Sequence, residues 1–307
     1  MRAFTLDRFG SQPGLRDDLE EPAIADGDLL VRVHASSVNP VDAFIGAGAL
    51  KEMAEHEFPV ILGRDYAGVV ERVGSDVSGY AAGDEVFGFL KHANPSVHAG
   101  TWAELIAVPH DDSVAAKPGG LDFVHAGAAP LAAITALAAS DALALESGES
   151  VLVVGASGGV GSFFVQLAAA AGARVIATAL AEDHDYLREL GVGELVDRNG
   201  DVAAAVRGLH AEGVDAIMDA ASPAPDASAL TEGGRLASPL GAAGEGPGRF
   251  NVMAAATTPN LRRLAELLES GTLVVPIQRS FPLDRAGEAL ESLQAVHTQG
   301  KAGVTME

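Results

Sequence analysis

The chain contains no cysteine among its 307 residues. Disulfide bonds, iron–sulfur clusters and thiolate zinc sites all need cysteine sulfur, so none of them can form here. A cysteine nucleophile is excluded for the same reason. Chemistry at this protein therefore depends on other side chains, on the backbone or on a bound cofactor.

Long apolar runs and basic residues are also scarce. No segment reaches the roughly 20 consecutive apolar residues that a membrane-spanning helix needs. The first residues, Met1–Asp7, are too short and too polar a stretch for a secretory signal, so we expect a cytoplasmic protein. Only 20 Lys and Arg stand against 42 Asp and Glu, which gives a formal charge of −22. Such a surface repels nucleic acid and anionic membranes, and we expect neither as a partner.

A glycine-rich turn is the most informative motif in the sequence. It follows an apolar, strand-like run, Val151–Val154, and precedes an apolar stretch, Ser162–Ala171, with helical character. Glycine lets the backbone approach a pyrophosphate, and the free N–H groups and positive dipole end of a helix stabilise that anion. This context predicts a dinucleotide site, although such turns also occur where a strand and a helix merely pack closely. The predicted binding residues are Gly155, Ala156, Ser157, Gly158, Gly159, Val160 and Gly161.

The rest of the chain divides into two kinds of sequence. Residues 1–120 hold short β-like runs separated by Gly, Pro and Asp, which is typical of a compact, mainly β domain. Residues 121–271 alternate strand-like and helix-like segments, as in a Rossmann domain with a doubly wound parallel sheet. Residues 272–307 return to β character, and we expect them to pack on the first domain. The predicted fold class is therefore α/β.

Hydrophobic periodicity sets the expected elements of the second domain. The expected strands are Val151–Val154, Arg174–Thr178, Leu195–Val196, Val214–Met218 and Arg235–Pro239. The expected helices are Phe123–Leu145, Phe163–Ala171, Asp185–Leu190, Asp201–Leu209, Pro225–Leu230 and Pro259–Ser270.

Several short runs follow one another in an order and spacing that resemble the medium-chain dehydrogenase/reductase superfamily, and within it the zinc-free quinone oxidoreductase, or zeta-crystallin-like, branch. Besides the glycine turn, the matching runs are Ser37–Asp42, Phe58–Val70, Gly83–Gly88, Gly100–Glu104, Pro130–Ala136, Gly233–Ser238 and Gly300–Lys301. The resemblance covers essentially the whole chain. It implies a GroES-like β domain beside the Rossmann domain, with a nicotinamide cofactor in the cleft between them.

The resemblance also implies chemistry without a metal ion. Zinc alcohol dehydrogenases of the same fold usually carry a catalytic Cys early in the first domain, and Gly-His-Glu where this chain has Gly63-Arg64-Asp65. Because zinc is the Lewis acid that stabilises the alkoxide in those enzymes, we expect no metal site here and no ordinary alcohol dehydrogenation.

Three residues are implied to lie near the nicotinamide or the substrate: Asn39, Asp42 and Thr135. In this interpretation Asn39 donates a hydrogen bond to the hydride acceptor, and Asp42 orients Asn39 or a proton-carrying water. Each has an ordinary structural alternative, because Asn-Pro is a common turn and an Asp at this spacing suits a helix cap.

The end of the second Rossmann strand distinguishes NADPH from NADH. Enzymes that use NAD commonly carry Asp or Glu there, whereas this chain has Ala179 after Thr178, which leaves room for a 2′-phosphate. Arg198 could bind that phosphate or face solvent at a strand end. We therefore expect NADPH, with NADH as the alternative, because Glu182 could bind the ribose. The other expected cofactor contacts are Ser238, Pro239 and Leu240 at a strand end, and Lys301, which could instead be a surface lysine.

These observations favour an NADPH-dependent reductase that transfers a hydride to a quinone or an α,β-unsaturated carbonyl. Such small, conjugated acceptors spread the developing charge and need only a well-placed nicotinamide. The alternative is a non-catalytic nucleotide-binding protein that serves as a redox sensor or a structural component. The resemblance also places a strand near Arg249–Ala255 at a dimer interface, so we expect a homodimer.

Overall fold

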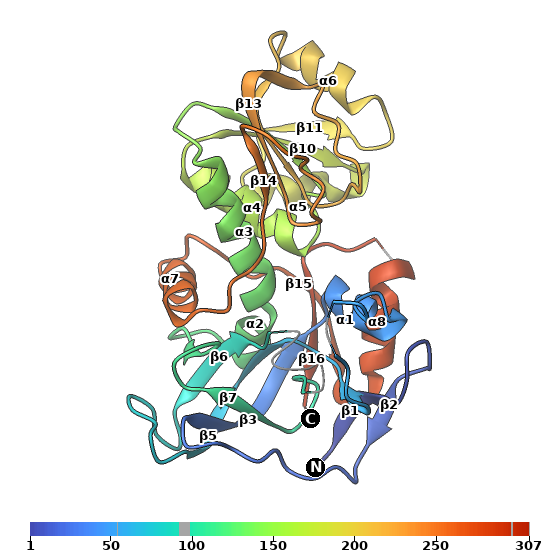
Figure 1. Cartoon of the computed structure of the whole chain (residues 1–307). Coiled ribbons are helices and arrows are strands. Elements are labelled where there is room, and N and C mark those ends of the chain that lie inside the picture. Colours follow the sequence, from blue (N-terminus) through green and yellow to red (C-terminus); the bar gives the residue numbers. More distant parts are fainter. Residues whose placement is uncertain (54, 92–98, 296, 307) are drawn as a thin grey trace. The chain divides into compact units, whose positions relative to one another are not determined.

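The computed structural model describes residues 1–53, 55–91, 99–295 and 297–306. The chain folds into two compact units, each described separately below (Figure 1). The first unit contains Met1–Leu131, Ala256–Ser270 and Val275–Glu307, and the second contains Ala132–Ala255 and Gly271–Val274. The C-terminal segment therefore returns to the first unit.

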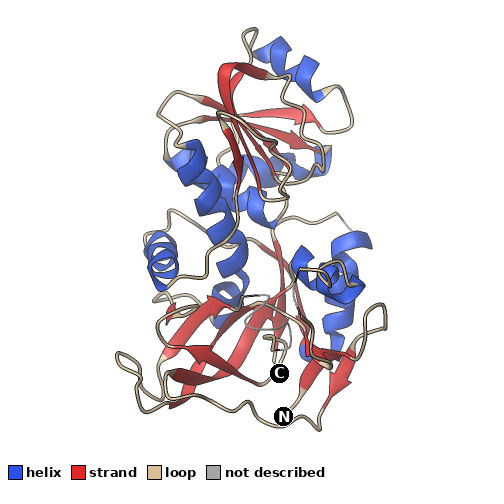
Figure 2. Ribbon diagram, in the orientation of Figure 1, coloured by secondary structure: helices blue, strands red, loops and turns tan. Residues whose placement is uncertain are grey.

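The first unit is built on two β-sheets (Figure 2). The larger sheet contains β3 (Asp28–Ser37), β5 (Asp65–Val73), β6 (Glu85–Phe89), β7 (Leu105–Pro109), β8 (Ala115–Ala116), β15 (Ile277–Pro282) and β16 (Lys301–Thr305). Its strand order is β15-β16-β3-β5-β6-β8, with β7 also paired to β3. A smaller sheet contains β1 (Ala3–Leu6), β2 (Gly14–Arg16) and β4 (Val60–Ile61). The helices of this unit are α1 (Pro40–Ala47), α2 (Phe123–Ala128), α7 (Thr258–Glu269) and α8 (Ala286–Ala295).

The pairing of β16 with β3 positions the candidate site. The two strands run antiparallel, with Gly303 opposite Ser37. This register brings the start of β16 beside the end of β3, where the chain enters α1. The interior of the unit is apolar around Trp102, which is fully buried, contacts Phe4 edge to face and donates a hydrogen bond from Nε1 to the Ser37 carbonyl oxygen at 3.2 Å.

The second unit contains a parallel sheet of six strands with the order β11-β10-β9-β12-β13-β14. The strands are β9 (Ser150–Val154), β10 (Arg174–Ala179), β11 (Glu194–Asp197), β12 (Val214–Asp219), β13 (Leu230–Ser238) and β14 (Arg249–Asn251). The helices are α3 (Pro130–Leu143), which begins at the boundary of the two units, α4 (Gly159–Ala170), α5 (His184–Glu189) and α6 (Val202–Leu209). Numbered along the chain, this is the 3-2-1-4-5-6 order of a dinucleotide-binding fold, and the predicted α/β class is confirmed.

Two of the expected helices differ from the structure. The helix expected at Pro225–Leu230 is wrong: the segment before Leu230 is irregular, and Leu230 begins β13. The Asp226 carboxylate accepts the Ser228 backbone N–H at 2.8 Å, a local turn that competes with a helix. The helix expected at Phe123–Leu145 is divided into α2 and α3. Proline lacks an N–H, so Pro130 interrupts the helical ladder and begins the second helix.

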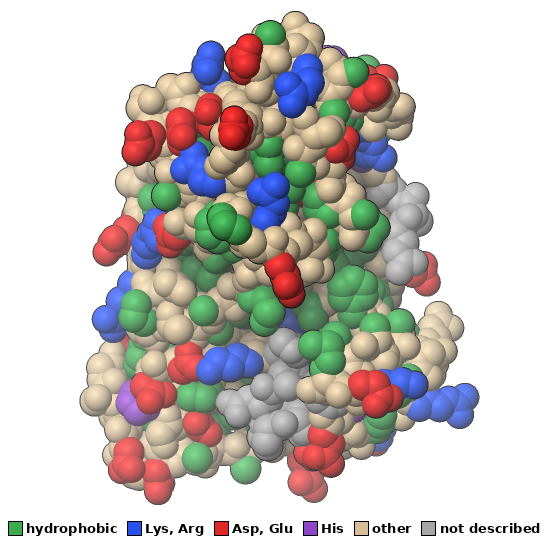
Figure 3. All heavy atoms as spheres, turned by 45° about the horizontal axis from the view of Figure 1, so that its top comes forward, with side chains coloured by type: hydrophobic (Ala, Val, Ile, Leu, Met, Phe, Trp, Pro, Cys, Tyr) green, Lys and Arg blue, Asp and Glu red, His purple; other side chains and the backbone are tan. Residues whose placement is uncertain are grey.

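The surface carries charge of both signs. On the face drawn in Figure 3, acidic side chains are dispersed among basic and apolar ones and form no single block. Within the described parts of the chain, no helix combines the length and the apolar character that a bilayer crossing requires.

Candidate active site

Asn39 lies at the junction between β3 and α1 in the first unit. It is the N-cap residue of α1, with an extended backbone (φ −132°, ψ 154°), and Pro40 follows in the first helical turn. The Asp42 carboxylate accepts the Asn39 backbone N–H at 2.9 Å, which makes Asp42 part of a capping box. Asp42 also accepts the Gly63 backbone N–H at 3.1 Å. The contacts of Asp42 therefore match the helix-cap alternative.

Asp42 is fully buried, and its environment disfavours the ionised carboxylate. Removal from water raises the pKa of Asp42 to about 6, while the positive charge of Arg64 and the hydrogen bond from Asn39 act in the opposite direction. Arg64 is buried as well, and burial lowers the pKa of its guanidinium. Its Nη2 donates to the Ile61 carbonyl oxygen at 3.1 Å and its Nη1 to that of Lys91 at 3.3 Å.

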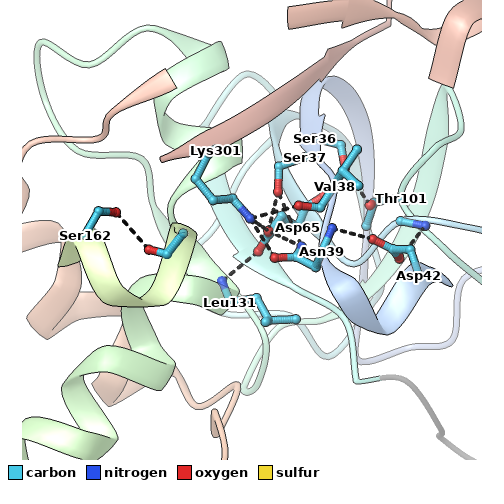
Figure 4. Close-up of polar contacts among 12 residues, drawn as sticks. Ser36, Ser37, Val38, Asn39, Asp42, Asp65, Thr101, Leu131, Ser162 and Lys301 are labelled. Atoms are coloured by element: carbon cyan, nitrogen blue, oxygen red, sulfur yellow. Dashed lines mark hydrogen bonds and ion pairs between the residues drawn. The ribbon is translucent and has the colours of Figure 1, made fainter. Parts of the chain in front are cut away.

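A second buried network joins Asn39 to Lys301 and Asp65 (Figure 4). The Lys301 ammonium donates to Asn39 Oδ1 at 2.6 Å and to the Val38 carbonyl oxygen at 3.1 Å, and it lies 3.7 Å from Asp65 Oδ2. The side chain of Lys301 is 3% exposed and that of Asp65 is fully buried. Burial lowers the pKa of Lys301, and the negative charges of Asp65 and Asp42 oppose that change. Lys301 is therefore buried, which excludes the alternative of a surface lysine; its expected contact with the cofactor stays a prediction.

Asp65 is the centre of this network. Its Oδ2 accepts hydrogen bonds from Ser37 Oγ at 2.6 Å and from Asn39 Nδ2 at 2.7 Å, and its Oδ1 accepts the Leu131 backbone N–H at 2.7 Å. This last contact lies at the beginning of α3, where free N–H groups favour a negative charge. Sequence reasoning did not identify Asp65 as a site residue. The available signal was an ionisable pair, Arg64-Asp65, inside an otherwise apolar run.

The glycine turn lies in the second unit, between β9 and α4. Gly155 has a φ of +79°, which the left-handed region allows most easily for glycine. A Cβ on Gly161 would lie 2.1 Å from the Gly155 carbonyl oxygen, so this position holds the helix close to the strand. At Gly158 the nearest atom to an added Cβ would be the Gly155 carbonyl oxygen at 3.5 Å. Ser162 is fully buried in the first turn of α4, and its Oγ donates to the Gly159 carbonyl oxygen at 3.0 Å.

The other expected cofactor residues of this unit lie at carboxyl ends of its strands. Thr178 and Ala179 end β10, and Ser238 ends β13. Ala179 is paired in register with Asp197 of β11, and the Arg198 backbone N–H donates to the Ala179 carbonyl oxygen at 3.1 Å. Open α/β sheets bind ligands at this edge. Arg198 directly follows β11, with its backbone beside the end of β10.

The remaining expected residues of this unit adjoin the same elements. Ala156 and Ser157 are buried in the glycine turn, and Val160 lies in the first turn of α4. Pro239 and Leu240 follow β13, and the Leu240 backbone N–H donates to Ser238 Oγ at 3.2 Å.

The expected residues thus divide between the two units. Asn39, Asp42 and Lys301 belong to the first unit, whereas Thr135 lies buried in the part of α3 that belongs to the second. The structure joins Lys301 to Asn39 by a direct hydrogen bond, and the glycine turn is in the other unit.

Comparison with known families gives two matches. Residues 25–119 match the alcohol dehydrogenase GroES-like domain, and residues 159–274 match the zinc-binding dehydrogenase family. The second description names zinc, but the residues present do not fit that ion. The chain has no cysteine, and the Lys301 ammonium already lies against Asn39 Oδ1. Among the residues that the structure describes, no group of three His, Asp or Glu side chains is placed to hold a metal ion.

Individual relatives match over nearly the whole chain. The chain is 31% identical to the chloroplastic NADPH-dependent alkenal/one oxidoreductase of Arabidopsis thaliana, over 99% of this chain and 79% of that protein. It is also 31% identical to the quinone oxidoreductase of Mus musculus, over 99% of this chain and 96% of that protein. The solved structure of the quinone oxidoreductase from Coxiella burnetii superposes with a TM-score of 0.89 at 29% identity, covering 100% of this chain and 99% of that one. The chain therefore belongs to the medium-chain dehydrogenase/reductase superfamily of oxidoreductases, in its quinone oxidoreductase branch.

Proposed function

We propose that the protein is an NADPH-dependent reductase that transfers a hydride to a quinone or an α,β-unsaturated carbonyl without a metal ion. The observation that carries this proposal is the glycine turn between β9 and α4, on a sheet with the strand order of a dinucleotide-binding fold. The names of the relatives support the acceptor class, since they include an alkenal/one oxidoreductase, a 2-methylene-furan-3-one reductase and quinone oxidoreductases.

The geometry of the glycine turn suits a pyrophosphate. The residues from Gly155 to Gly161 bring the backbone to the N-terminus of α4, where N–H groups and the helix dipole stabilise an anion. Gly158 has no Cβ to obstruct an approaching phosphate, and the nearest atom to an added Cβ would be the Gly155 carbonyl oxygen at 3.5 Å. When bound, reduced nicotinamide supplies the hydride and is left oxidised, while the electron pair reaches the acceptor oxygen and a proton from water completes the reduction.

The protein's part in this reaction is to hold the acceptor and stabilise charge on its oxygen. We assign Asn39 as the donor to that oxygen and Asp42 as the residue that orients Asn39, because Asp42 accepts its backbone N–H at 2.9 Å. Thr135 is the third proposed residue, near the nicotinamide. Both carboxylate oxygens of Asp42 already accept backbone N–H groups, which supports an orienting role.

The proposed cofactor is NADPH, with NADH as the alternative. Ala179 lacks the carboxylate that would bind ribose hydroxyls and repel a 2′-phosphate. Arg198 supports NADPH, since its backbone is bonded to Ala179 and its guanidinium can bind a phosphate with two hydrogen bonds. Glu182 lies in the short 3₁₀ helix Ala181–Asp183 after β10 and is exposed, so it is the residue to test for the opposite preference.

Stopped-flow absorbance at 340 nm is the direct test. Purified protein is mixed with NADPH or NADH and then with a panel of quinones and conjugated enones. Rapid oxidation of NADPH by one acceptor class would support the proposal. Tight NADPH binding without oxidation by any acceptor would refute the reductase assignment and favour the non-catalytic sensor. An unchanged cofactor preference in Arg198→Ala would contradict the role of that arginine.

We also propose a homodimer. The supporting observation is that β14 occupies one end of the six-stranded sheet, with Met253 exposed two residues after it. An edge strand can pair with a second copy across a two-fold axis. Light scattering after size-exclusion chromatography should give twice the 31.2 kDa chain mass. A monomer mass at micromolar concentration would contradict this proposal.

The expected cytoplasmic location stays a proposal. The named relatives include chloroplastic and mitochondrial proteins. Fractionation of the source cells with an antibody against the protein would test it, and recovery in a membrane or organelle fraction would contradict it.

A further inference from the structure

The carboxamide of Asn39 lies between two groups of fixed and opposite hydrogen-bonding character. An ammonium can only donate, so Lys301 Nζ must face the carbonyl oxygen of the amide, at 2.6 Å. Asp65 Oδ2 accepts the hydrogen bond of Ser37 Oγ and lies 3.7 Å from the Lys301 ammonium, so it is an acceptor and faces the amide nitrogen, at 2.7 Å. The two neighbours therefore select one of the two orientations that an asparagine amide can take. The reversed orientation would place donor against donor and acceptor against acceptor.

The two N–H groups of Asn39 are not equally engaged. One is held by Asp65 at 2.7 Å. The other has Ser37 Oγ at 3.4 Å, beyond the usual 2.7–3.2 Å range for an N–H donor, and the Ser37 hydroxyl itself donates to Asp65 at 2.6 Å. Asn39 Oδ1 is occupied by the ammonium. The amide thus retains one weakly bound donor and offers no carbonyl oxygen to a ligand.

Burial strengthens the hydrogen bonds that hold the Asn39 side chain. Asn39, Asp65 and Lys301 are all buried, and in a low-dielectric interior hydrogen bonds to charged groups are stronger and polarise one another. A cation on Oδ1 draws electron density from the amide and makes its N–H a better donor. The Asp42 contacts fix the backbone of the same residue from the other side. Both the side chain and the backbone of Asn39 are consequently held.

We propose that Lys301 is a positioning residue that locks the Asn39 carboxamide, so that its weakly bound N–H donates to the acceptor's carbonyl oxygen as negative charge develops there. This inference rests on the proposed reductase function. It assigns Lys301 a role other than cofactor binding, and it limits the acceptor to molecules that present a carbonyl oxygen to the amide. Lys301 acts only through Asn39.

A set of four variants separates this role from the alternatives. Lys301→Met removes the donor, and Lys301→Gln retains an uncharged donor that is one bond shorter. Asn39→Ala removes the amide. Lys117→Met is the matched structural control, because Lys117 is also a lysine of the first unit with a buried side chain, 7% exposed and 3.1 Å from Glu85, and its ammonium donates to the carbonyl oxygens of Pro118 and Leu121. Thermal unfolding of each variant identifies any that fail to fold.

The measurements are kcat and KM with the best quinone or enone, and the Kd of NADPH from fluorescence. We expect Lys301→Met and Asn39→Ala to lower kcat by about 100-fold each, as for loss of an oxyanion donor, with the Kd of NADPH changed less than threefold. Their combination should be no slower than the slower single variant, because both remove the same interaction. Lys301→Gln should recover part of the loss, and Lys117→Met should retain wild-type kcat.

Three results would overturn the inference. These are a tenfold weaker NADPH affinity in Lys301→Met with kcat intact, multiplicative losses in the double variant, and an equal loss of kcat in Lys117→Met. Binding of 4-nitrophenolate to the oxidised-cofactor complex, followed at 400 nm, provides a readout that does not need turnover. If the wild type reduces no acceptor yet binds the phenolate, and Lys301→Met and Asn39→Ala weaken that binding tenfold alike, the reductase function fails and the positioning role stands. If the wild type binds no phenolate, the positioning role fails as well.

Discussion

Alanine substitutions at Gly158 and Gly161 should have opposite effects, although the two glycines stand three residues apart in one turn. At Gly161 the new Cβ would lie 2.1 Å from the Gly155 carbonyl oxygen and 2.8 Å from Ala156 Cα, and these backbone atoms must move. Forcing atoms into a packed site costs about 1–3 kcal/mol, and the upper end applies when backbone must shift. At roughly 2–4 °C per kcal/mol, we expect the Tm to fall by about 10 °C.

Gly158→Ala should instead leave the fold intact and weaken the cofactor. Gly158 has φ −76° and ψ 176°, which alanine adopts readily, and its nearest neighbour would be 3.5 Å away. The stability change should stay within about 1 kcal/mol, the typical value for an N-cap change. The added methyl group would stand at the N-cap of α4, where the pyrophosphate is proposed to bind, so we expect the Kd of NADPH to rise at least tenfold, or about 1.4 kcal/mol.

Differential scanning fluorimetry and NADPH fluorescence titration on the same preparations separate the two outcomes. Unchanged NADPH affinity in Gly158→Ala would refute the assignment of this turn to the pyrophosphate. An unchanged Tm in Gly161→Ala would refute the packing argument. A lower Tm in both variants would mean that the turn is chiefly a packing feature, which is the structural alternative for a glycine-rich strand-to-helix turn.

Three further predictions concern other parts of the chain. Burial raises the pKa of Asp42 from 3.8 to about 6, so the protonated carboxyl stabilises the fold fully below pH 3.8, and this stabilisation is lost as the pH rises through 6. The free energy of unfolding should fall by about 3 kcal/mol across that range. Urea unfolding from pH 4 to 7.5 should show this fall in the wild type and not in Asp42→Asn, and parallel curves for the two proteins would refute it. Gly63→Ala should prevent folding, because φ is +86° and the new Cβ would lie 2.3 Å from Trp102. Gly79→Ala is the control: φ is +83° in open space, so the variant should fold and lose about 1 kcal/mol of unfolding free energy. A soluble, native-like Gly63→Ala protein would contradict the packing argument. Arg198→Glu should raise the KM for NADPH at least tenfold and leave that for NADH within threefold, and equal changes for both cofactors would exclude phosphate recognition by this residue.

The fold was predictable because its signals are local. Parallel strands buried on both faces read as short apolar runs, and β9, β10 and β12 each fall within a residue of the expected ends. The failure at Pro225–Leu230 has a physical reason. Alanine and leucine favour a helix there, but the Asp226 carboxylate offers the Ser228 backbone N–H another hydrogen bond, which a count of apolar residues does not detect.

The site was only partly predictable because its defining contacts are long-range. Asn39 and Asp42 were expected as site residues from the family resemblance of the run Ser37–Asp42, and the helix cap between them is a local feature. Lys301 contacts Asn39 across a sequence separation of 262 residues, and only the pairing of β16 with β3 brings them together. A sequence pattern cannot distinguish such a lysine from a surface lysine. Asp65 was missed for the same reason, since its partners come from β3, α1, α3 and β16.

The energetic cost of these buried charges is an argument for their role in the chemistry. Isolated charges lose several kcal/mol of hydration when buried, and apolar replacements of buried ion pairs are often neutral or stabilising. The raised pKa of Asp42 means that its ionised form is a net burden on the folded state at neutral pH. Packing alone would not require Asp42, Arg64, Asp65 and Lys301 in the interior of one unit, because apolar side chains could fill the same volume. What apolar side chains cannot supply is a fixed orientation of the Asn39 amide. In the proposed mechanism, the stability lost to burial is coupled to one well-oriented donor, which is the property that hydride transfer to a carbonyl acceptor needs.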